Sequence, residues 1–228
     1  MSPRILAGSS ALLIALAAPA AAQALPTIQP LKSCYVTAAT PQGPQSEGVQ
    51  ITAAGFTPNS KVNLSIDGVP FPNGQNLQTD PAGGLPIAPV PAPFVQSGSR
   101  DFTVTLTEAD NPANTVSATA KSTALGVTVT PSTARPSQRI RFRGLGFTDA
   151  KPIYAHYIHK GKVRKTVRMA RRPRTCGGFN TRRRQIPIKK PGLGKWIIQF
   201  DQSKRFIDPT KTPIVYVRLG ITLRLVPR

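Results

Sequence analysis

The second half of this sequence contains almost no acidic residues. Between Ser122 and Arg228 there are twenty-five Lys or Arg and three Asp or Glu, which gives a net charge of +22. Between Leu25 and Lys121 there are four basic and six acidic residues, which gives −2. A change of this size indicates two bodies with different roles, and it marks the second as one that attracts anions.

Catalytic signatures are also missing. The chain has nine acidic residues and two histidines, and it contains no nucleophile elbow, phosphate-binding loop or metalloprotease motif. General acid–base catalysis needs a positioned pair of groups, and Asp201 and Asp208 stand where turn or ion-pair residues are expected. His156 and His159 are three apart on a predicted strand, so they face opposite sides. We predict no enzymatic activity, no cofactor and no metal site.

Cysteine is rare as well, because Cys34 and Cys176 are the only two. In an oxidising compartment the simplest use of such a pair is a disulfide. A bond within the chain would join the first half to the second. Two free thiols, or a bond to another chain, are the alternatives.

Apolar runs long enough to cross a membrane are absent. The longest run, Ile5–Ala18, is shorter than the roughly 20 residues of a spanning helix. It lies between a basic start and Ala22-Gln23-Ala24, which has the form of a cleavage site. We predict a helical signal peptide over residues 1–24, cleavage near Ala24, and a secreted or envelope-associated mature chain with no transmembrane segment. An uncleaved anchor and a lipidated Cys34 are the alternatives.

The two halves share a sequence register. An offset of 91 residues carries Val49-x-Ile51 onto Ile140-x-Phe142 and Gly55-Phe56-Thr57 onto Gly146-Phe147-Thr148. At an offset of 94, the alternating Phe102, Val104 and Leu106 match Trp196, Ile198 and Phe200. This self-similarity predicts a duplicated unit of roughly 90 to 100 residues.

Alternation with a period of two dominates both copies. In Arg139–Arg143 three arginines alternate with Ile140 and Phe142, and Phe102–Thr107 and Val215–Leu225 alternate similarly. This pattern is typical of strands with one buried and one wet face. Twenty-four prolines and eighteen glycines interrupt long helices, and Lys160-Gly161 has the form of a tight hairpin turn. We predict an all-β chain with two tandem β-sandwiches, at residues 25–121 and 122–228.

One strand pattern carries a resemblance to known families. Val127-Thr128-Val129-Thr130-Pro131, followed by Ile140-x-Phe142-x-Gly144-x-Gly146-Phe147, resembles the bacterial immunoglobulin-like domains of secreted and surface proteins. Val49-x-Ile51-x-Ala53-x-Gly55-Phe56 repeats it. The N-terminal strands are also similar to those of the neocarzinostatin-type chromophore carriers. These resemblances imply an immunoglobulin-like fold for each unit, but a fold does not specify a function.

The two copies diverge in their middle segments. Residues 69–99 are rich in Pro and Gly and predict an extended, partly polyproline connection. Residues 160–190 hold thirteen Lys or Arg and no acid. Because binding sites often lie in connections carried by a rigid scaffold, we predict a polyanion-binding site here. Its residues are Arg164, Lys165, Arg168, Arg171, Arg172, Arg174, Arg182, Arg183, Arg184, Lys189 and Lys190.

The composition of the basic segment narrows the class of partner. Guanidinium groups match phosphate, sulfate and carboxylate with two parallel hydrogen bonds. Few aromatics accompany them, unlike in sequence-specific nucleic-acid readers. We predict a non-catalytic secreted or cell-envelope binding protein that associates with an anionic envelope polymer or extracellular nucleic acid, with other surface proteins as further partners. The alternatives are a structural or adhesive envelope protein whose charge is non-specific, and a small-ligand carrier with a pocket between its sheets.

Overall fold

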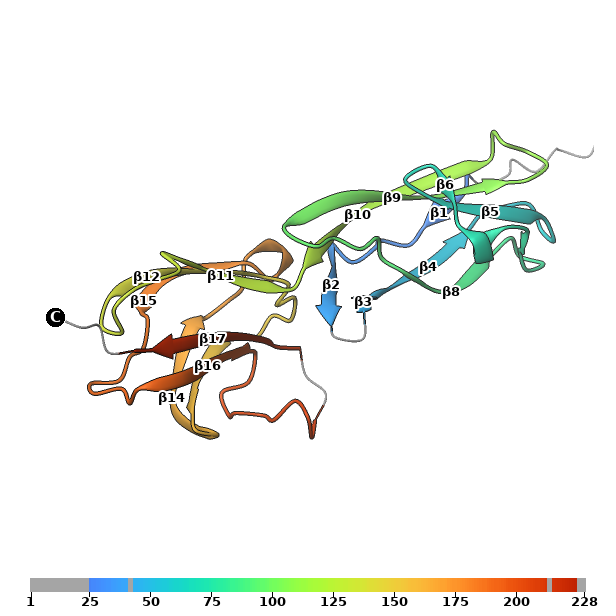
Figure 1. Cartoon of the computed structure of the whole chain (residues 1–228). Helices are drawn as coiled ribbons and strands as arrows, with labels where there is room; N and C mark the ends of the chain where they lie inside the picture. Colours follow the sequence, from blue (N-terminus) through green and yellow to red (C-terminus); the bar gives the residue numbers. More distant parts are fainter. Residues whose placement is uncertain (1–24, 41–42, 213–214, 225–228) are drawn as a thin grey trace, which may run out of the picture.

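The computed structural model describes residues 25–40, 43–212 and 215–224 (Figure 1). Over these ranges the chain is all-β, with four sheets and two short 3₁₀ turns, which confirms the predicted class. No helix in this part of the chain is long and apolar enough to cross a membrane. The signal peptide predicted at residues 1–24 lies outside the described residues.

The strands form two groups along the chain, seen as two lobes in Figure 1. The first group comprises β1 (Thr27–Ile28), β2 (Cys34–Thr40), β3 (Gly43–Ser46), β4 (Gly48–Ala54), β5 (Lys61–Ile66), β6 (Val69–Pro70), the turn η1 (Pro72–Gly74), β7 (Leu77–Gln78), β8 (Leu85–Pro91), β9 (Ser99–Glu108) and β10 (Thr115–Ala124). The second comprises β11 (Gly126–Thr130), β12 (Arg139–Leu145), β13 (Ile153–His159), β14 (Lys162–Ala170), the turn η2 (Thr175–Gly177), β15 (Phe179–Arg184), β16 (Gly194–Asp201) and β17 (Val217–Leu223).

Each group has two sheets that share one apolar core. The first unit, β1 to β10, has sheets ordered β1-β4-β8 and β3-β2-β10-β9-β5-β6, with β7 also on β5. The second unit, β11 to β17, has sheets ordered β11-β12-β15 and β14-β13-β16-β17. Both sheets of a unit contribute buried residues to its core, among them Ile51 and Phe102 in the first and Phe142 and Trp196 in the second. Alternating apolar residues therefore face inward in both layers, as the period of two predicted.

The duplication seen in the sequence is also present in the strands. The 91-residue offset carries β4 onto β12 with both bounds matched. The 94-residue offset carries β8 onto β15 and β9 onto β16 to within one residue at each end. Pairings agree too, because β4 pairs with β8 as β12 pairs with β15, and β5 pairs with β9 as β13 pairs with β16. One strand plan therefore occurs twice.

The units depart from each other after a shared hairpin turn. Asp67 and Gly68 have φ of 51° and 78°, and Lys160 and Gly161 have 50° and 72°, which confirms the hairpin predicted at Lys160-Gly161. The strand that follows has two residues in the first unit and nine in the second. Prolines lack an N–H donor, so the proline-rich stretch that begins at Pro70 cannot extend β6 as β14 extends.

The prediction of a simple connection over residues 69–99 is incomplete. This segment contains β8, which pairs with β4 along the edge of its sheet. Its prolines are tolerated because one side of an edge strand needs no ladder hydrogen bonds. Alternating prolines thus concealed a strand whose partner is distant in sequence.

The junction between units is short. β10 ends at Ala124 and β11 begins at Gly126, so the boundary placed between residues 121 and 122 falls inside β10. In the first unit β10 pairs in parallel with β2. The next strand, β11, belongs to the second unit and pairs with β12. The limits of the two units at residues 25–121 and 122–228 stay a prediction.

Candidate functional site

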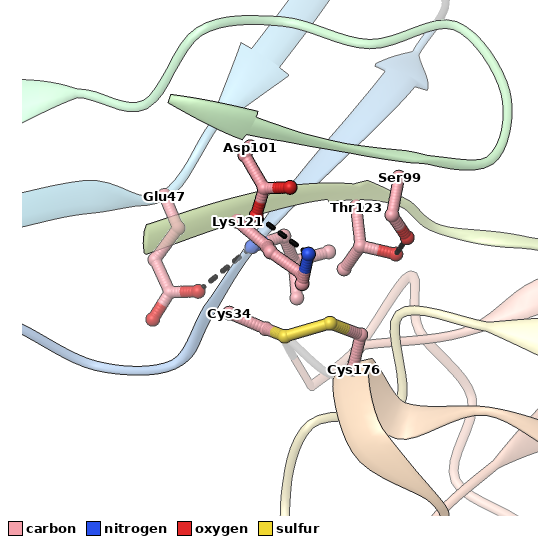
Figure 2. Close-up of a disulfide and its surroundings, with 8 residues drawn as sticks. Cys34, Glu47, Ser99, Asp101, Lys121, Thr123 and Cys176 are labelled. Atoms are coloured by element: carbon pink, nitrogen blue, oxygen red, sulfur yellow. Dashed lines mark hydrogen bonds and ion pairs between the residues drawn. A yellow bond between two sulfur atoms is a disulfide. The ribbon is translucent and has the colours of Figure 1, made fainter. Parts of the chain in front are cut away.

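The two units are joined by a covalent bond as well as by the chain. Cys34 at the start of β2 is bonded to Cys176 in η2, with their Cα atoms 5.2 Å apart and a sequence separation of 142. Figure 2 shows the bond next to the Lys121–Asp101 ion pair and the Ser99–Thr123 hydrogen bond. The predicted intrachain disulfide is confirmed, and a bonded Cys34 is not free to carry a lipid.

The turn that holds Cys176 is fixed to the core of the second unit. Cys176 has a positive φ of 56°, and its carbonyl oxygen accepts a hydrogen bond from the Gly146 amide at 3.0 Å. A side chain at Gly177 would overlap the backbone of Phe147, so only glycine fits there. The disulfide therefore holds this turn, which lies in the middle of the basic segment 160–190, to the first unit.

A hollow lies between the units beside this junction. It has a volume of about 620 Å³ and is lined by β2 and β3 on one side and by Val215–Arg218 on the other. The Arg218 guanidinium lies over the Tyr216 ring at 5.4 Å and donates a hydrogen bond to Gln199 at 3.0 Å. This hollow is at the surface, whereas the space between the sheets of each unit is filled by the two cores.

The predicted polyanion-binding residues occupy two layers of the second unit. Arg164, Lys165 and Arg168 lie on β14, at the edge of one sheet, whereas Arg182, Arg183 and Arg184 lie on β15, at the edge of the other. Arg171, Arg172 and Arg174 follow β14 in the turn before η2, and Lys189 and Lys190 follow β15. The structure thus distributes these residues over two edges.

The basic triplet on β15 is itself divided by the strand alternation. Arg183 pairs in register with the buried Ile140, so it lies on the inward side. There its charge acts to lower the pKa of Tyr157, although burial has the larger effect and raises that pKa far above its usual value. Arg182 and Arg184 lie on the outward side, opposite Arg141 and Arg139.

Five arginines therefore share the outer face of the β11-β12-β15 sheet. We call Arg139, Arg141, Arg143, Arg182 and Arg184 the arginine face. Arg139 is directly opposite Arg184 and Arg141 directly opposite Arg182, while Arg143 is opposite Asn180. Directly opposed like charges on a sheet are destabilising. Folding alone gives no reason to place them there.

A shallow hollow follows these side chains. It has a volume of about 370 Å³ and is lined by Thr130, Pro131 and four of the five arginines. Among the described residues none of the five forms an ion pair. One side-chain hydrogen bond links the arginines of β12 to β15. The Arg139 guanidinium donates it to the Arg182 carbonyl oxygen at 3.4 Å.

The acids of the second unit are engaged elsewhere. Asp149 pairs with Lys151 at 3.5 Å. Asp208 accepts hydrogen bonds from the Thr210 amide and hydroxyl, which hold its pKa below the usual value. Asp201 is buried against His156. The three acids of the second half thus leave the arginine face uncompensated.

His156 and Asp201 form a buried polar cluster on the opposite sheet. The His156 Nε2 atom is 3.2 Å from an Asp201 carboxylate oxygen, and its Nδ1 atom is 2.9 Å from the Thr166 hydroxyl. Asp201 also accepts hydrogen bonds from the Ser203 amide and the Gln199 side chain, both at 2.9 Å. The bond from the Ser203 amide, two residues on, is of the kind that turn residues accept, which is one of the two roles expected for Asp201.

His159 lies on the other side of the same strand. Its ring stacks on Trp196 at 4.5 Å between centroids, and its Nδ1 atom is 3.2 Å from the Lys195 carbonyl oxygen. The two histidines therefore point to opposite faces of β13, as predicted. Among the described residues, no three His, Cys, Asp or Glu side chains gather as metal ligands would.

Sequence reasoning did not include Arg139, Arg141 and Arg143 in the site. Their alternation with Ile140 and Phe142 was used only as a sign of a strand. The signal was nevertheless present, because an acid-free wet face with an arginine at every second position is unusual for a solvated strand. What the sequence did not show was that β15, forty residues later, would complete the face.

Comparisons with known proteins give little further information. No protein family and no curated protein matches the chain. A solved structure of the tetra-tandem repeat in the extending region of a large adhesion protein is similar, with 14% sequence identity and a TM-score of 0.29. That similarity covers 77% of this chain and 45% of the adhesion-protein chain, so the present chain spans less than half of that structure. A likeness this slight supports no conclusion about function, which therefore depends on the chain's own geometry.

Proposed function

We propose that this chain is a non-catalytic protein of the cell envelope or the extracellular space with a structural or adhesive role. Each two-layered unit is taken to be an immunoglobulin-like β-sandwich. Support for the compartment comes from the disulfide, because such bonds persist mainly in oxidising environments. The predicted signal peptide and cleavage near Ala24 agree with it.

The observation that carries this proposal is the position of the Cys34–Cys176 bond. A disulfide inside one sandwich would stabilise that sandwich alone. This one joins η2 of the second unit to the first strand of the long sheet in the first unit. It limits how the two units move relative to each other, which suits a protein that holds two attachment points at a fixed separation.

The test compares residues 25–228 in the oxidised form with the C34S/C176S variant. We expect both to fold, and we expect the oxidised form to show the narrower distribution of distances between dyes placed on the two units. Under flow, the oxidised form should remain longer on envelope preparations. Equal distance distributions and equal retention would contradict the proposed role of the bond.

A second candidate function is binding of anionic polymers by the second unit. It is favoured by the net charge of +22 after residue 121, since a field of this sign concentrates anions near the surface. The partner would be an anionic envelope polymer or extracellular nucleic acid. Titration of the full mature chain with anionic and neutral polysaccharides across salt tests it. Affinity should fall steeply with salt for the anionic polymer alone, and equal binding to both would contradict it.

A further inference from the structure

The arginine face carries an inference about where, and to what, the second unit attaches. The five arginines are arranged in rows across three strands. Thr130, Arg141 and Arg182 form one row, while Thr128, Arg143 and Asn180 form the next. Arg139 and Arg184 form the third. All outward positions in these rows are arginines or neutral hydrogen-bonding residues, and none is acidic.

Ile140 and Phe142 fix the direction of these side chains. Both are fully buried between Arg139, Arg141 and Arg143, so the alternation of β12 holds its arginines on the outside. The strand therefore sets a repeat of about 6.6–6.8 Å between successive arginines. The arginines of β15 lie beside those of β12, with about 4.5–5.5 Å between the Cβ atoms of directly opposed residues.

The same face of the first unit shows that the scaffold does not require this charge. At the 91-residue offset, Arg139, Arg141 and Arg143 correspond to Gly48, Gln50 and Thr52 on β4. β4 keeps its buried Val49 and Ile51 without any basic neighbour on its outer side. The opposed arginines are thus an addition to a plan that folds without them.

We propose that the arginine face binds a linear phosphodiester polymer lying along β12. A compact anion would contact one row, whereas an extended chain with one charge per short repeat contacts all three. Guanidinium groups fit phosphate oxygens with two parallel hydrogen bonds, and the bound charges relieve the repulsion between opposed arginines. The ligand's backbone is what is recognised.

The absence of aromatic side chains on this face separates backbone recognition from base recognition. Phe142 and Phe179, the aromatics of these three strands, are both buried in the core. Single-stranded nucleic-acid binders normally stack bases on exposed aromatic rings. Polyol-phosphate polymers and DNA therefore share the recognised chemistry, and base identity should not affect affinity.

The experiment uses the full mature chain and removes the central row with the R141Q/R182Q variant. The matched control is R205Q/R224Q, which removes the same charge at two exposed arginines outside β11, β12 and β15. The probes are poly(glycerol phosphate), oligo(dT), oligo(dA) and a sulfated glycan of equal charge. Each is titrated from about 0.05 to about 0.3 M salt.

We expect R141Q/R182Q to bind both phosphodiester polymers at least about tenfold more weakly at physiological salt. Its salt slope should be smaller by about 1.4, since each lost contact removes about 0.7 for a single strand. The R205Q/R224Q control should keep nearly all of its affinity. Oligo(dT) and oligo(dA) should bind equally, and the sulfated glycan more weakly.

The stability of the variant without ligand shows whether weaker binding is caused by misfolding. Without ligand, R141Q/R182Q should be at least as stable as the parent, because it removes a directly opposed like-charge pair. The R141K/R182K variant keeps the charge but loses the planar fork, so intermediate affinity is expected. Equal losses in R141Q/R182Q and R205Q/R224Q would show that binding follows net charge, which would overturn the proposed site.

Two other outcomes also count against the proposal. Equal or tighter binding of the sulfated glycan would overturn the phosphodiester assignment, and no binding of any polymer at physiological salt would overturn the site altogether. The inference rests on the proposed adhesive function for the role that polymer binding would play, but the binding itself is tested separately. Failure of polymer binding leaves retention under flow and its dependence on the disulfide intact, so the two failures are distinguishable.

Discussion

The two units follow one strand plan but treat charge in opposite ways. In the first unit, three of the four basic side chains form ion pairs, which are Lys32–Glu47, Arg100–Asp67 and Lys121–Asp101. In the described part of the second unit, Lys151 alone among the lysines and arginines does so. Basic residues in the first unit are therefore balanced locally, whereas those of the second remain available for a partner.

The units also differ in one pair of polar positions. His156 and Asp201 are buried in the second unit, whereas the matching residues of the first unit, Ser65 and Thr107, are partly exposed. The pair in the second unit is covered by the segment that follows β16, whose Ser203 contacts both members. The second unit thus buries a polar pair at positions that stay partly exposed in the first unit.

The largest expected difference is in the cores themselves. Phe142→Ala should lower the free energy of unfolding of the second unit by about 3–5 kcal/mol, because it leaves a cavity. Its counterpart Ile51→Ala should cost the first unit about 2–5 kcal/mol. Urea unfolding followed by Trp196 fluorescence reports the second unit, since Trp196 is the one tryptophan. Equal shifts of that signal in both variants would show that the units do not unfold separately.

Removal of the buried carboxylate should have the next largest effect. Asp201→Ala removes the acceptor shared by His156, Gln199 and the Ser203 amide, and leaves the first two with one carbonyl oxygen each. We expect a loss of roughly 3 kcal/mol from the second unit by the same fluorescence measurement. The matched Thr107→Ala in the first unit should change stability by less than about 0.5 kcal/mol. A small effect of Asp201→Ala would mean that the cluster is hydrated.

One pair of positions shows how the two copies compensate in packing. Ala53 pairs with Leu85 in the first unit, whereas Gly144 pairs with Phe179 in the second. A Cβ atom at Gly144 would overlap the Phe179 ring. Gly144→Ala should therefore cost about 1–3 kcal/mol.

The double variant G144A/F179L gives the second unit the alanine–leucine pair that the first unit has at these positions. It should be more stable than the sum of the single changes by about 0.5–3 kcal/mol, measured as a double-mutant cycle in urea. Strict additivity would mean that the two positions are not coupled and that the glycine has another cause.

The smallest expected effect is on how the stability of the first unit depends on pH. Burial raises the pKa of Glu108, but hydrogen bonds from the Asn114 side chain and from Thr57 lower it, and the pKa lies below the usual value of a glutamate. Because the folded-state pKa is the lower one, Glu108 stabilises the fold above its unfolded pKa, and this contribution disappears as pH falls through the folded value.

The Glu108→Gln variant removes this titrating group. Between about pH 6 and about pH 3, the first unit of the variant should lose less stability than that of the parent. Amide exchange of β9 provides the measurement, and Trp196 fluorescence should show no difference in the second unit. An unchanged pH dependence in β9 would contradict the assigned hydrogen bonds.

Several features of this protein follow from its sequence alone. Strand faces are local, because alternation in Arg139–Arg143 or Phe102–Thr107 needs no distant partner to be recognised. The 91-residue register revealed the duplicated plan, and two cysteines in different halves indicated the bond between them. The turn at Lys160-Gly161 was equally local, since glycine readily adopts a positive φ.

The strand β8 and the composition of the arginine face were decided only by the tertiary structure. Pairing joins segments distant in the chain, and it determined that β15 continues the row begun on β12 while β14 joins the other sheet. Alternation along β15 places Arg182 and Arg183 on opposite sides, and the pairing with β12 decides that Arg182 is the one that lies opposite Arg141. Composition and local alternation alone thus establish that the second half is basic and β-stranded. Only the packing of two layers decided which arginines face one partner, because strand neighbours depend on register and not on sequence proximity.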